Sequence, residues 1–286
     1  MGSDPLRSLT PFILSTMKVI TSADSLKPFR GCAFVPTMGA LHDGHLSLIR
    51  EAKNADKTVV VSIFVNPEQF APEEDLDKYP RNLEQDCAFA ESVGADVVFA
   101  PSVETMYPTG SNESLSNLHI PWAATKPLLE DACRPTHFLG VCVAVARLFD
   151  LVQPSITVFG LKDYQQYLVI KQLIEQEGKR WSDLQIIGAG IIRDDGGLAM
   201  SSRNVYLTTD QRSQALGLHK AIRCSTEKAM LETLDVYGLD VEYAVIRDSE
   251  TLLAPIEGKP TRALVAARLG HIRLIDNAPV NMGVQL

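Results

Sequence analysis

Residues 58–66 (TVVVSIFVN) form an almost unbroken run of apolar and β-branched residues. A strand with one face in water alternates apolar and polar residues, whereas a central parallel strand covered on both faces does not. The run therefore predicts a buried parallel strand. Shorter runs of similar character occur at 30–36, 95–100 and 155–160.

Helix-like stretches separate these runs in the sequence. We predict helices over residues 46–55, 83–93, 138–151 and 164–176. A regular alternation of strand and helix is typical of a doubly wound, Rossmann-like α/β sheet with right-handed crossovers. The first two-thirds of the chain are therefore expected to adopt this fold.

The pattern changes after about residue 188. Residues 208–211 have the form of a capping box, which predicts a long helix toward Glu232. Strand candidates follow at 241–247, 262–268 and 272–275, with a hairpin turn at Leu269-Gly270. We predict a Rossmann-like domain over 17–188 and a smaller α+β domain over 189–286. Residues 1–16 are expected to be a leader or a natural extension.

Charge and cysteine usage narrow the range of partners. The formal net charge is −8, which argues against nucleic acid as a partner because that binding depends on phosphate neutralisation. A local basic pocket for a small phosphorylated ligand stays open. The 5 cysteines are odd in number and form no C-x-x-C pair, which predicts free thiols in the cytoplasm. No stretch has the length or apolarity of a membrane span.

The segment PTMGALHDGH, residues 36–45, directly follows a predicted strand and precedes a helix. Ligands of open parallel sheets bind at such strand ends, and a helix N-terminus favours an anion. The helix dipole supplies only ~0.3–1 kcal/mol, so His42, His45 and distant cations must add to it. A metal site would need a third ligand, and purely structural histidines are a further alternative. We favour contact with nucleotide phosphate.

Three more polar segments follow strand ends or turns. Asn66 and Gln69 offer amides to a small polar substrate, although Asn at a strand end is also common in turns. Lys162 lies at the start of a predicted helix. A cation there is disfavoured by the helix dipole, so a bound anion is expected beside it. A Lys–phosphate pair at ~4 Å is worth ~4 kcal/mol at an effective dielectric near 20. Asp163 and Gln166 have the spacing of a helix cap, which is the alternative there.

The fourth segment, residues 200–204 (MSSRN), places hydroxyls before a guanidinium, as in a mobile phosphate clamp. A polar linker is the alternative. Between the second and third segments, the loop RPTH at 134–137 can hold Arg134 over an anionic site.

Taken in order, the blocks FVPTMGALHDGH, VVVSIFVNPEQF, KYPR, RPTHFLGV, FGLKDYQQ and GLAMSSRN resemble the pantothenate synthetase (pantoate–β-alanine ligase) family of the nucleotidylyltransferase-like Rossmann superfamily. The resemblance runs from about Arg30 to Arg203 and continues more weakly beyond. It implies a small C-terminal lid domain over 189–286 and a homodimer. It also implies a two-step reaction: pantoate and Mg·ATP form pantoyl adenylate and pyrophosphate, and β-alanine then displaces AMP to give pantothenate.

The resemblance also implies residue roles. His45, as proton donor, with His42, Lys162 and Arg203 would be catalytic. ATP would contact Met38, Gly39, Ala40, Leu41, His42, Asp43, Gly44, His45, Gly160, Leu161, Lys162, Asp163, Ile192, Met200, Ser201, Ser202 and Arg203. Pantoate would contact Gln69, Gln166, Asn66, Arg134 and His137, and β-alanine would contact Gln69 and Tyr79. Asp86 would lie on the Mg²⁺ side.

Two positions depart from the family pattern, because Leu161 stands where members carry Glu and Glu68 where several carry an apolar residue. The nearest alternative is another nucleotidylyltransferase with the H-x-G-H motif, which would release pyrophosphate without an amine. A tRNA-charging enzyme would need a positive face and an anticodon-binding extension. A nucleotide sensor would need neither His42 nor Lys162.

Overall fold

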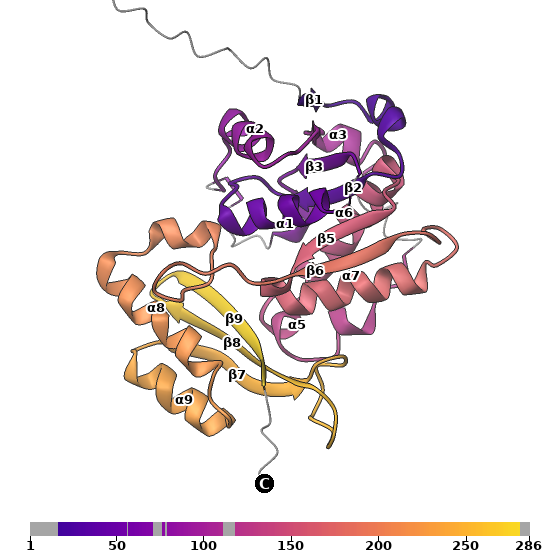
Figure 1. Ribbon diagram of the computed structural model, residues 1–286. Helices are drawn as coiled ribbons and strands as arrows, with labels where there is room; N and C mark the ends of the chain where they lie inside the picture. The colour runs from indigo at the N-terminus through magenta and orange to yellow at the C-terminus, as the bar shows by residue number, and fades with distance from the viewer. Residues whose placement is uncertain (1–16, 56, 71–75, 78, 111–117, 281–286) are drawn as a thin grey trace, which may run out of the picture.

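The computed structural model describes residues 17–55, 57–70, 76–77, 79–110 and 118–280. Six parallel strands form one sheet in the order β1-β4-β3-β2-β5-β6 (Figure 1). Their bounds are β1 Lys18–Ile20, β2 Ala33–Thr37, β3 Val59–Ile63, β4 Val97–Phe99, β5 Ile156–Gly160 and β6 Gln185–Ala189. The prediction of a doubly wound parallel sheet is confirmed, although β1 and β6 were not predicted.

Helices cover both faces of this sheet. On one face lie α1 (Asp43–Lys53) and α2 (Leu83–Ser92), and on the other α6 (His137–Val152) and α7 (Tyr164–Gln176). Alternate residues of β2 enter different cores: Phe34 packs with the α6 side, and Val35 with the α1 side. Burial on both faces explains why residues 58–66 are almost all apolar or β-branched.

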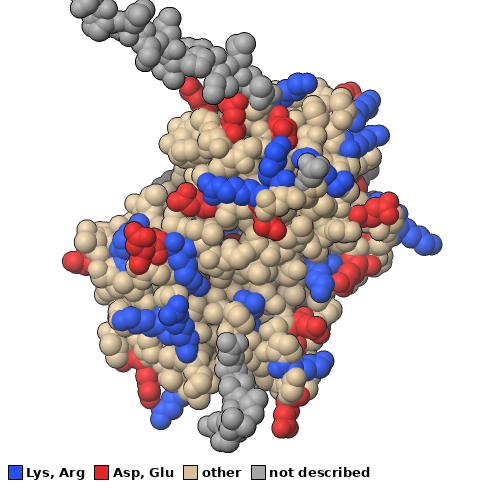
Figure 2. Space-filling view, viewed as in Figure 1, with Lys and Arg blue, Asp and Glu red and all other residues tan. Residues whose placement is uncertain are grey.

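Short elements connect these layers. They are η1 (Ala23–Phe29), η2 (Pro67–Gln69), α3 (Val103–Met106), η3 (Trp122–Ala124), α5 (Glu130–Cys133), η4 (Leu161–Asp163) and η5 (Ser202–Tyr206). Among the described residues, no helix combines the length and apolar character needed to cross a bilayer. Lysines and arginines are interspersed with acidic side chains over the face drawn in Figure 2.

The C-terminal part is a three-stranded antiparallel sheet packed against two helices (Figure 1). Its elements are α8 (Thr209–Ala221), α9 (Glu227–Val236), β7 (Asp240–Asp248), β8 (Thr261–Leu269) and β9 (Ile272–Val280). The hairpin turn is confirmed, with Gly270 at φ 60°. β9 continues beyond the predicted end at residue 275. The division into domains at residue 188 stays a prediction.

The prediction of one long helix from residue 208 toward Glu232 is wrong. Thr208 and Gln211 do form the expected capping box at the start of α8. The helix ends at Ala221, and Thr226 begins α9 by accepting a hydrogen bond from the backbone N–H of Ala229. A second N-cap therefore divides what the sequence pattern suggested was continuous.

Candidate active site

The strand order reverses between β2 and β5, which makes this the switch point where open parallel sheets bind ligands. The two strands pair through Ala33↔Ile156 and Phe34↔Thr157, and their described ladder goes no further. They therefore separate toward their carboxyl ends. A cavity of about 250 Å³ lies there, lined by the segments that follow β2 and β5.

Most of the predicted site residues line this smaller cavity. It is bordered by Met38, His42, Gly44, His45, Asn66, Gln69, Tyr79, Arg134, His137, Gly160, Lys162, Asp163, Gln166, Ile192, Met200, Ser201, Ser202 and Arg203. Those not on its wall are Gly39, Ala40, Leu41, Asp43, Asp86 and Leu161. Segments far apart in the sequence thus converge on one cleft, as their positions at strand ends predicted.

The loop after β2 is shaped by the buried carboxylate of Asp86 on α2. Its two oxygens accept the backbone N–H groups of Ala40 at 3.0 Å and Leu41 at 2.7 Å. Gly39 has φ +82°, and an added Cβ there would lie 2.8 Å from Asp86 Oδ2. Only glycine fits this position. The structure thus gives Asp86 a loop-shaping role.

Metal ligation has little support in this geometry. Both Asp86 oxygens already accept backbone hydrogen bonds. The described part of the chain holds no group of three or more His, Cys, Asp and Glu side chains suited to an ion. The expectation of Asp86 on the Mg²⁺ side therefore stays a prediction without a structural argument.

His42 and His45 lie at the start of α1. His42 is the N-cap, and its Nδ1 accepts the Gly44 N–H at 3.1 Å; His45 Nδ1 accepts the His42 N–H at 3.4 Å. Burial, aided by nearby Lys162, lowers the pKa of His42 to about 4. Burial, then the neighbouring His42, lowers the pKa of His45 to about 3. Both rings are therefore neutral near pH 7, with the proton on Nε2.

Asn66, three residues beyond the end of β3, is 1% exposed, and all its side-chain groups have protein partners. Its oxygen accepts from Tyr107 Oη at 2.9 Å and from the Glu68 N–H at 3.2 Å. Its amide nitrogen donates to the Gly140 carbonyl at 3.1 Å and to Gln69 Oε1 at 3.3 Å. Asn66 thus caps η2, as the turn alternative foresaw, and it also orients Gln69 at the cavity wall.

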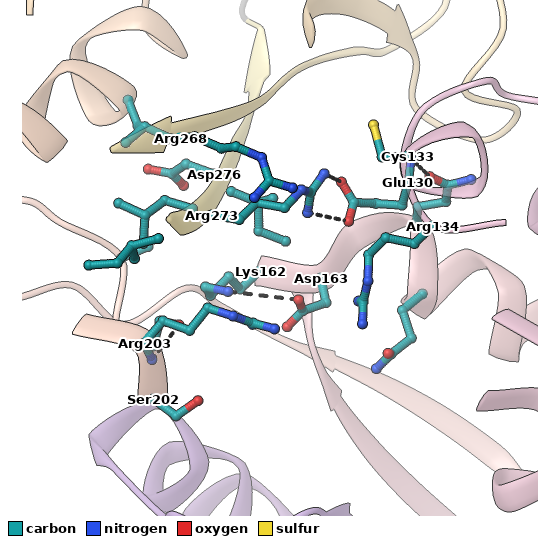
Figure 3. Close-up of a pocket in the computed structure, with 18 of the residues that line it drawn as sticks. Glu130, Cys133, Arg134, Lys162, Asp163, Ser202, Arg203, Arg268, Arg273 and Asp276 are labelled. Atoms are coloured by element: carbon teal, nitrogen blue, oxygen red, sulfur yellow. Dashed lines mark hydrogen bonds and ion pairs between the residues drawn. The ribbon is translucent and has the colours of Figure 1, made fainter. Parts of the chain in front are cut away.

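Lys162, Asp163 and Arg203 lie close together in the cleft (Figure 3). The ammonium of Lys162 is 3.7 Å from Asp163 Oδ1, and the Arg203 side chain extends toward the same carboxylate. Burial alone would raise the pKa of Asp163, but Lys162 and Arg203 hold it below its usual value. Asp163 makes no side-chain cap bond to α7, so the capping alternative is not realised.

The neighbouring segment 200–203 is joined to the Rossmann-like part through Tyr79. The Tyr79 hydroxyl is hydrogen-bonded to Ser202, and its ring packs edge-on against Phe70 at 5.9 Å between centroids. Ser201 Oγ accepts the Arg203 N–H at 3.3 Å, which caps η5. The polar linker of the sequence is therefore an ordered wall of the cleft.

The RPTH loop completes this end of the cleft. Arg134 extends into the same space from the end of α5 (Figure 3), and His137 Nδ1 donates to the Gln69 carbonyl at 3.1 Å. Of the two departures from the family pattern, Leu161 lies against Gly188 of β6, and Glu68 is exposed. Neither side chain lines the cavity.

A larger cavity of about 760 Å³ adjoins the first and brings in residues that sequence reasoning missed. Arg273 of β9 forms two bonds of 2.7 Å with Glu130 of α5, and Tyr243 Oη donates to Glu130 at 2.6 Å. Glu130 and Arg273 are 143 positions apart in the chain. No local pattern in the sequence indicates such a pair.

Comparisons with known proteins agree with this geometry. The profile of the family described as Pantoate-beta-alanine ligase matches residues 13–279. Pantothenate synthetase of Stenotrophomonas maltophilia (strain R551-3) is 47% identical over 257 residues, covering 86% of this chain and 90% of that one. That of Acinetobacter baumannii (strain AYE) is 44% identical over 277 residues, covering 90% and 95%.

Solved structures point the same way. Pantothenate synthetase from Thermus thermophilus superposes with a TM-score of 0.82 at 39% identity, covering 92% of this chain and 99% of that one. Pantoate-β-alanine ligase from Francisella tularensis, solved with β-γ ATP and β-alanine, gives 0.76 at 32% identity, covering 93% and 99%. The chain therefore belongs to the pantoate–β-alanine ligase family.

Proposed function

We propose that the cleft joins pantoate to β-alanine at the expense of ATP, through a pantoyl-adenylate intermediate. One observation carries the assignment of roles: His45, Lys162 and Arg203 come from three distant segments and line one cavity at the switch point of the sheet. Family membership supplies the reaction. The Francisella relative was solved with β-γ ATP and β-alanine, and we assign the same two kinds of ligand to this cleft.

In the first step, a carboxylate oxygen of pantoate forms a bond to the α-phosphorus of ATP, and the bond to the pyrophosphate oxygen breaks. Negative charge builds on the phosphate oxygens in the transition state. Lys162 and Arg203 supply positive charge there, and the two histidines supply Nε2–H donors. Such donors accelerate the reaction because they are in place before the charge develops. His45 then acts as a neutral hydrogen-bond donor, not as an imidazolium acid.

Pantoate itself is assigned to the amide-lined end of the cavity. Gln69 and Gln166 would bind its hydroxyl and carboxylate groups, with Asn66 holding Gln69 in place through their 3.3 Å contact. Arg134, His137 and Tyr79 line the same cavity, and we assign Arg134 and His137 to pantoate and Tyr79 to β-alanine. In the second step, the β-alanine nitrogen attacks the acyl carbon, the C–N bond forms, and AMP leaves with the electrons of the C–O bond.

Mg²⁺ is proposed as part of the substrate Mg·ATP. This ion commonly keeps several waters and binds through substrate phosphates with only one or two carboxylates. The described residues supply no dedicated cluster for it. No step of the scheme is assigned to a protein-bound metal.

The cellular setting is also a proposal. All five cysteines are free thiols, which supports a cytoplasmic enzyme. A homodimer is proposed on family membership alone. Residues 189–286 are proposed to act as a lid over 17–188.

A coupled assay with β-alanine present and then omitted tests this function. With ATP, Mg²⁺ and pantoate alone, we expect about one equivalent of pyrophosphate per site and then arrest. Adding β-alanine should start continuous release of AMP. Continuous pyrophosphate release that ignores the amine would favour the alternative H-x-G-H nucleotidylyltransferase.

A further inference from the structure

Two adjacent residues of β9, Asp276 and Asn277, are each 2% exposed and lie between the two segments that carry the cleft cations. Neither is a predicted site residue, and the sequence analysis ended this strand at residue 275. Buried polar side chains are costly unless they are hydrogen-bonded. The partners of these two residues therefore indicate what they do.

Asn277 bonds to the backbone on either side of Lys162's α-carbon. Its amide nitrogen donates to the Leu161 carbonyl at 3.0 Å and to the Lys162 carbonyl at 2.7 Å. Its oxygen accepts from Arg262, whose guanidinium stacks on the Tyr164 ring at 3.8 Å. With both ends engaged, the carboxamide cannot rotate without losing bonds. The Lys162 backbone is thereby fixed against β9.

Asp276 holds the second cationic segment through Arg193. The guanidinium donates to both carboxylate oxygens, at 2.6 and 2.9 Å, and also to the Gly197 carbonyl at 3.0 Å. Arg193 forms a β-bridge with Ala199, which comes directly before the segment 200–203. The turn leading to Arg203 is therefore anchored on Asp276.

The two anchors are joined to each other. Asp276 and Asn277 are neighbours in one strand, and the Asn277 N–H donates to Asp276 Oδ1 at 2.8 Å. The dipeptide Asp276-Asn277 thus anchors both backbone segments from which the Lys162 and Arg203 side chains extend. Displacement of a reacting or stabilising group by about 1 Å can cost about 100-fold in rate, so this spacing matters for catalysis.

We propose that Asp276 and Asn277 are positioning residues, which set the spacing of Lys162 and Arg203 so that both cations reach one triphosphate. The proposal rests on the proposed function. Neither side chain acts on substrate. Each acts through the segment it holds, Asn277 through Lys162 and Asp276 through the arm that leads to Arg203.

A double-mutant cycle tests this coupling. Asn277→Leu keeps a similar shape and removes both donors. In the wild-type background we expect it to slow adenylation, measured as single-turnover pyrophosphate formation, by about tenfold to 100-fold. In a Lys162→Gln background the further loss should be under about threefold, because coupled residues are not additive. Asp276→Asn should slow adenylation by a similar factor in the wild-type background, and by less than about threefold in the Arg203→Gln background.

Thr233→Val is the matched control, because it keeps the side-chain shape and removes one hydrogen bond within α9, from Thr233 Oγ1 to the Ala229 carbonyl, without touching either cationic segment. It should stay within about twofold of the wild type in every background. Melting temperatures identify any variant that is not folded. If Asn277→Leu is unfolded, Asn277→Asp replaces it, since a carboxylate keeps the Arg262 pair and loses both donors.

The outcomes separate the two hypotheses. Equal losses in the wild-type and Lys162→Gln backgrounds, or no loss at all, would overturn the positioning role. A wild-type protein without amine-dependent AMP release would overturn the proposed function instead. A loss confined to backgrounds that retain the cation supports the inference.

Discussion

His42 and His45 lie ring beside ring, with centroids 4.2 Å apart, and the Nδ1 of each accepts a backbone N–H. Each neutral ring therefore carries its proton on Nε2. Since burial lowers their pKa values to about 4 and about 3, the cleft offers two uncharged donors at neutral pH.

If neutral donation is the role of His45, glutamine should replace it better than alanine. The Gln amide can place an N–H near the position of Nε2. We expect His45→Ala to lower the adenylation rate by about 100- to 1,000-fold, the loss typical of one preorganised donor. His45→Gln should retain at least about tenfold more activity than His45→Ala. Equal rates in the two variants would contradict a donor role.

The same histidines should make stability depend on pH. Unfolded histidines titrate near pH 6.5, whereas the folded pKa values are about 4 for His42 and about 3 for His45. Between about pH 6.5 and 4 the unfolded state binds more protons, so the free energy of unfolding decreases as the pH falls.

Thermal unfolding at about pH 7.5 and pH 5 measures this effect. The wild type should lose more stability between the two values than a variant that carries both His42→Gln and His45→Gln. Carboxylates remote from the two histidines are present in both proteins and cancel in the comparison. An equal loss in both proteins would show that the pKa values are not lowered.

Removing the Lys162 ammonium should slow adenylation by about 100- to 1,000-fold, because the charge is lost where the transition state develops it. Pre-steady-state pyrophosphate formation by Lys162→Ala measures the change. Lys171→Ala is the control, since Lys171 lies on α7, which directly follows η4, is exposed and contacts Glu175 at 4.0 Å. Near-normal rates for Lys162→Ala would remove Lys162 from the mechanism.

Asp86→Asn should destabilise the loop after β2 by about 1–3 kcal/mol, because one of the two backbone N–H groups loses its acceptor. We expect a lower melting temperature and a higher KM for ATP. Glu84→Gln, on the exposed side of the same helix, should change neither. The adenylation rate of Asp86→Asn should depend on Mg²⁺ concentration as the wild-type rate does. A large shift in that dependence would support Asp86 as a metal ligand.

Gly140→Ala should disturb the pantoate end of the cleft. The added methyl would lie 2.1 Å from the Glu68 carbonyl oxygen, so α6 and η2 must separate. Overpacking of this kind typically costs about 1–3 kcal/mol, and the Asn66–Gly140 bond is strained with it. We expect a raised KM for pantoate. Gly178→Ala, whose methyl would be 3.4 Å from its nearest neighbour, is the control.

The parallel sheet could be predicted because central strands buried on both faces need continuous apolar runs, as residues 59–63 show. β1 and β6 were missed because β1 is three residues long with an exposed Val19, and both lie at sheet edges. The α8–α9 break was missed because residues 222–226 contain neither Gly nor Pro. Thr226 was the available signal.

The convergence of the four polar segments could also be predicted, since parallel strands present their carboxyl ends at one edge of a sheet. The contacts that hold those segments could not. Asn277 and Lys162 are 115 positions apart, and the pairing of Glu130 with Arg273 spans 143. Such pairs depend on how the small sheet docks, which no local pattern encodes.

The bond between Asn277 and the Lys162 carbonyl also orders events during synthesis. Lys162 leaves the ribosome well before Asn277, because 115 positions separate them. A nascent chain that has completed β5 and β6 but lacks β9 has no Asn277 to donate to the carbonyls of Leu161 and Lys162. If Asn277 positions Lys162 as proposed, we expect ATP turnover at its full rate only after the third strand of the small sheet has been translated and has docked.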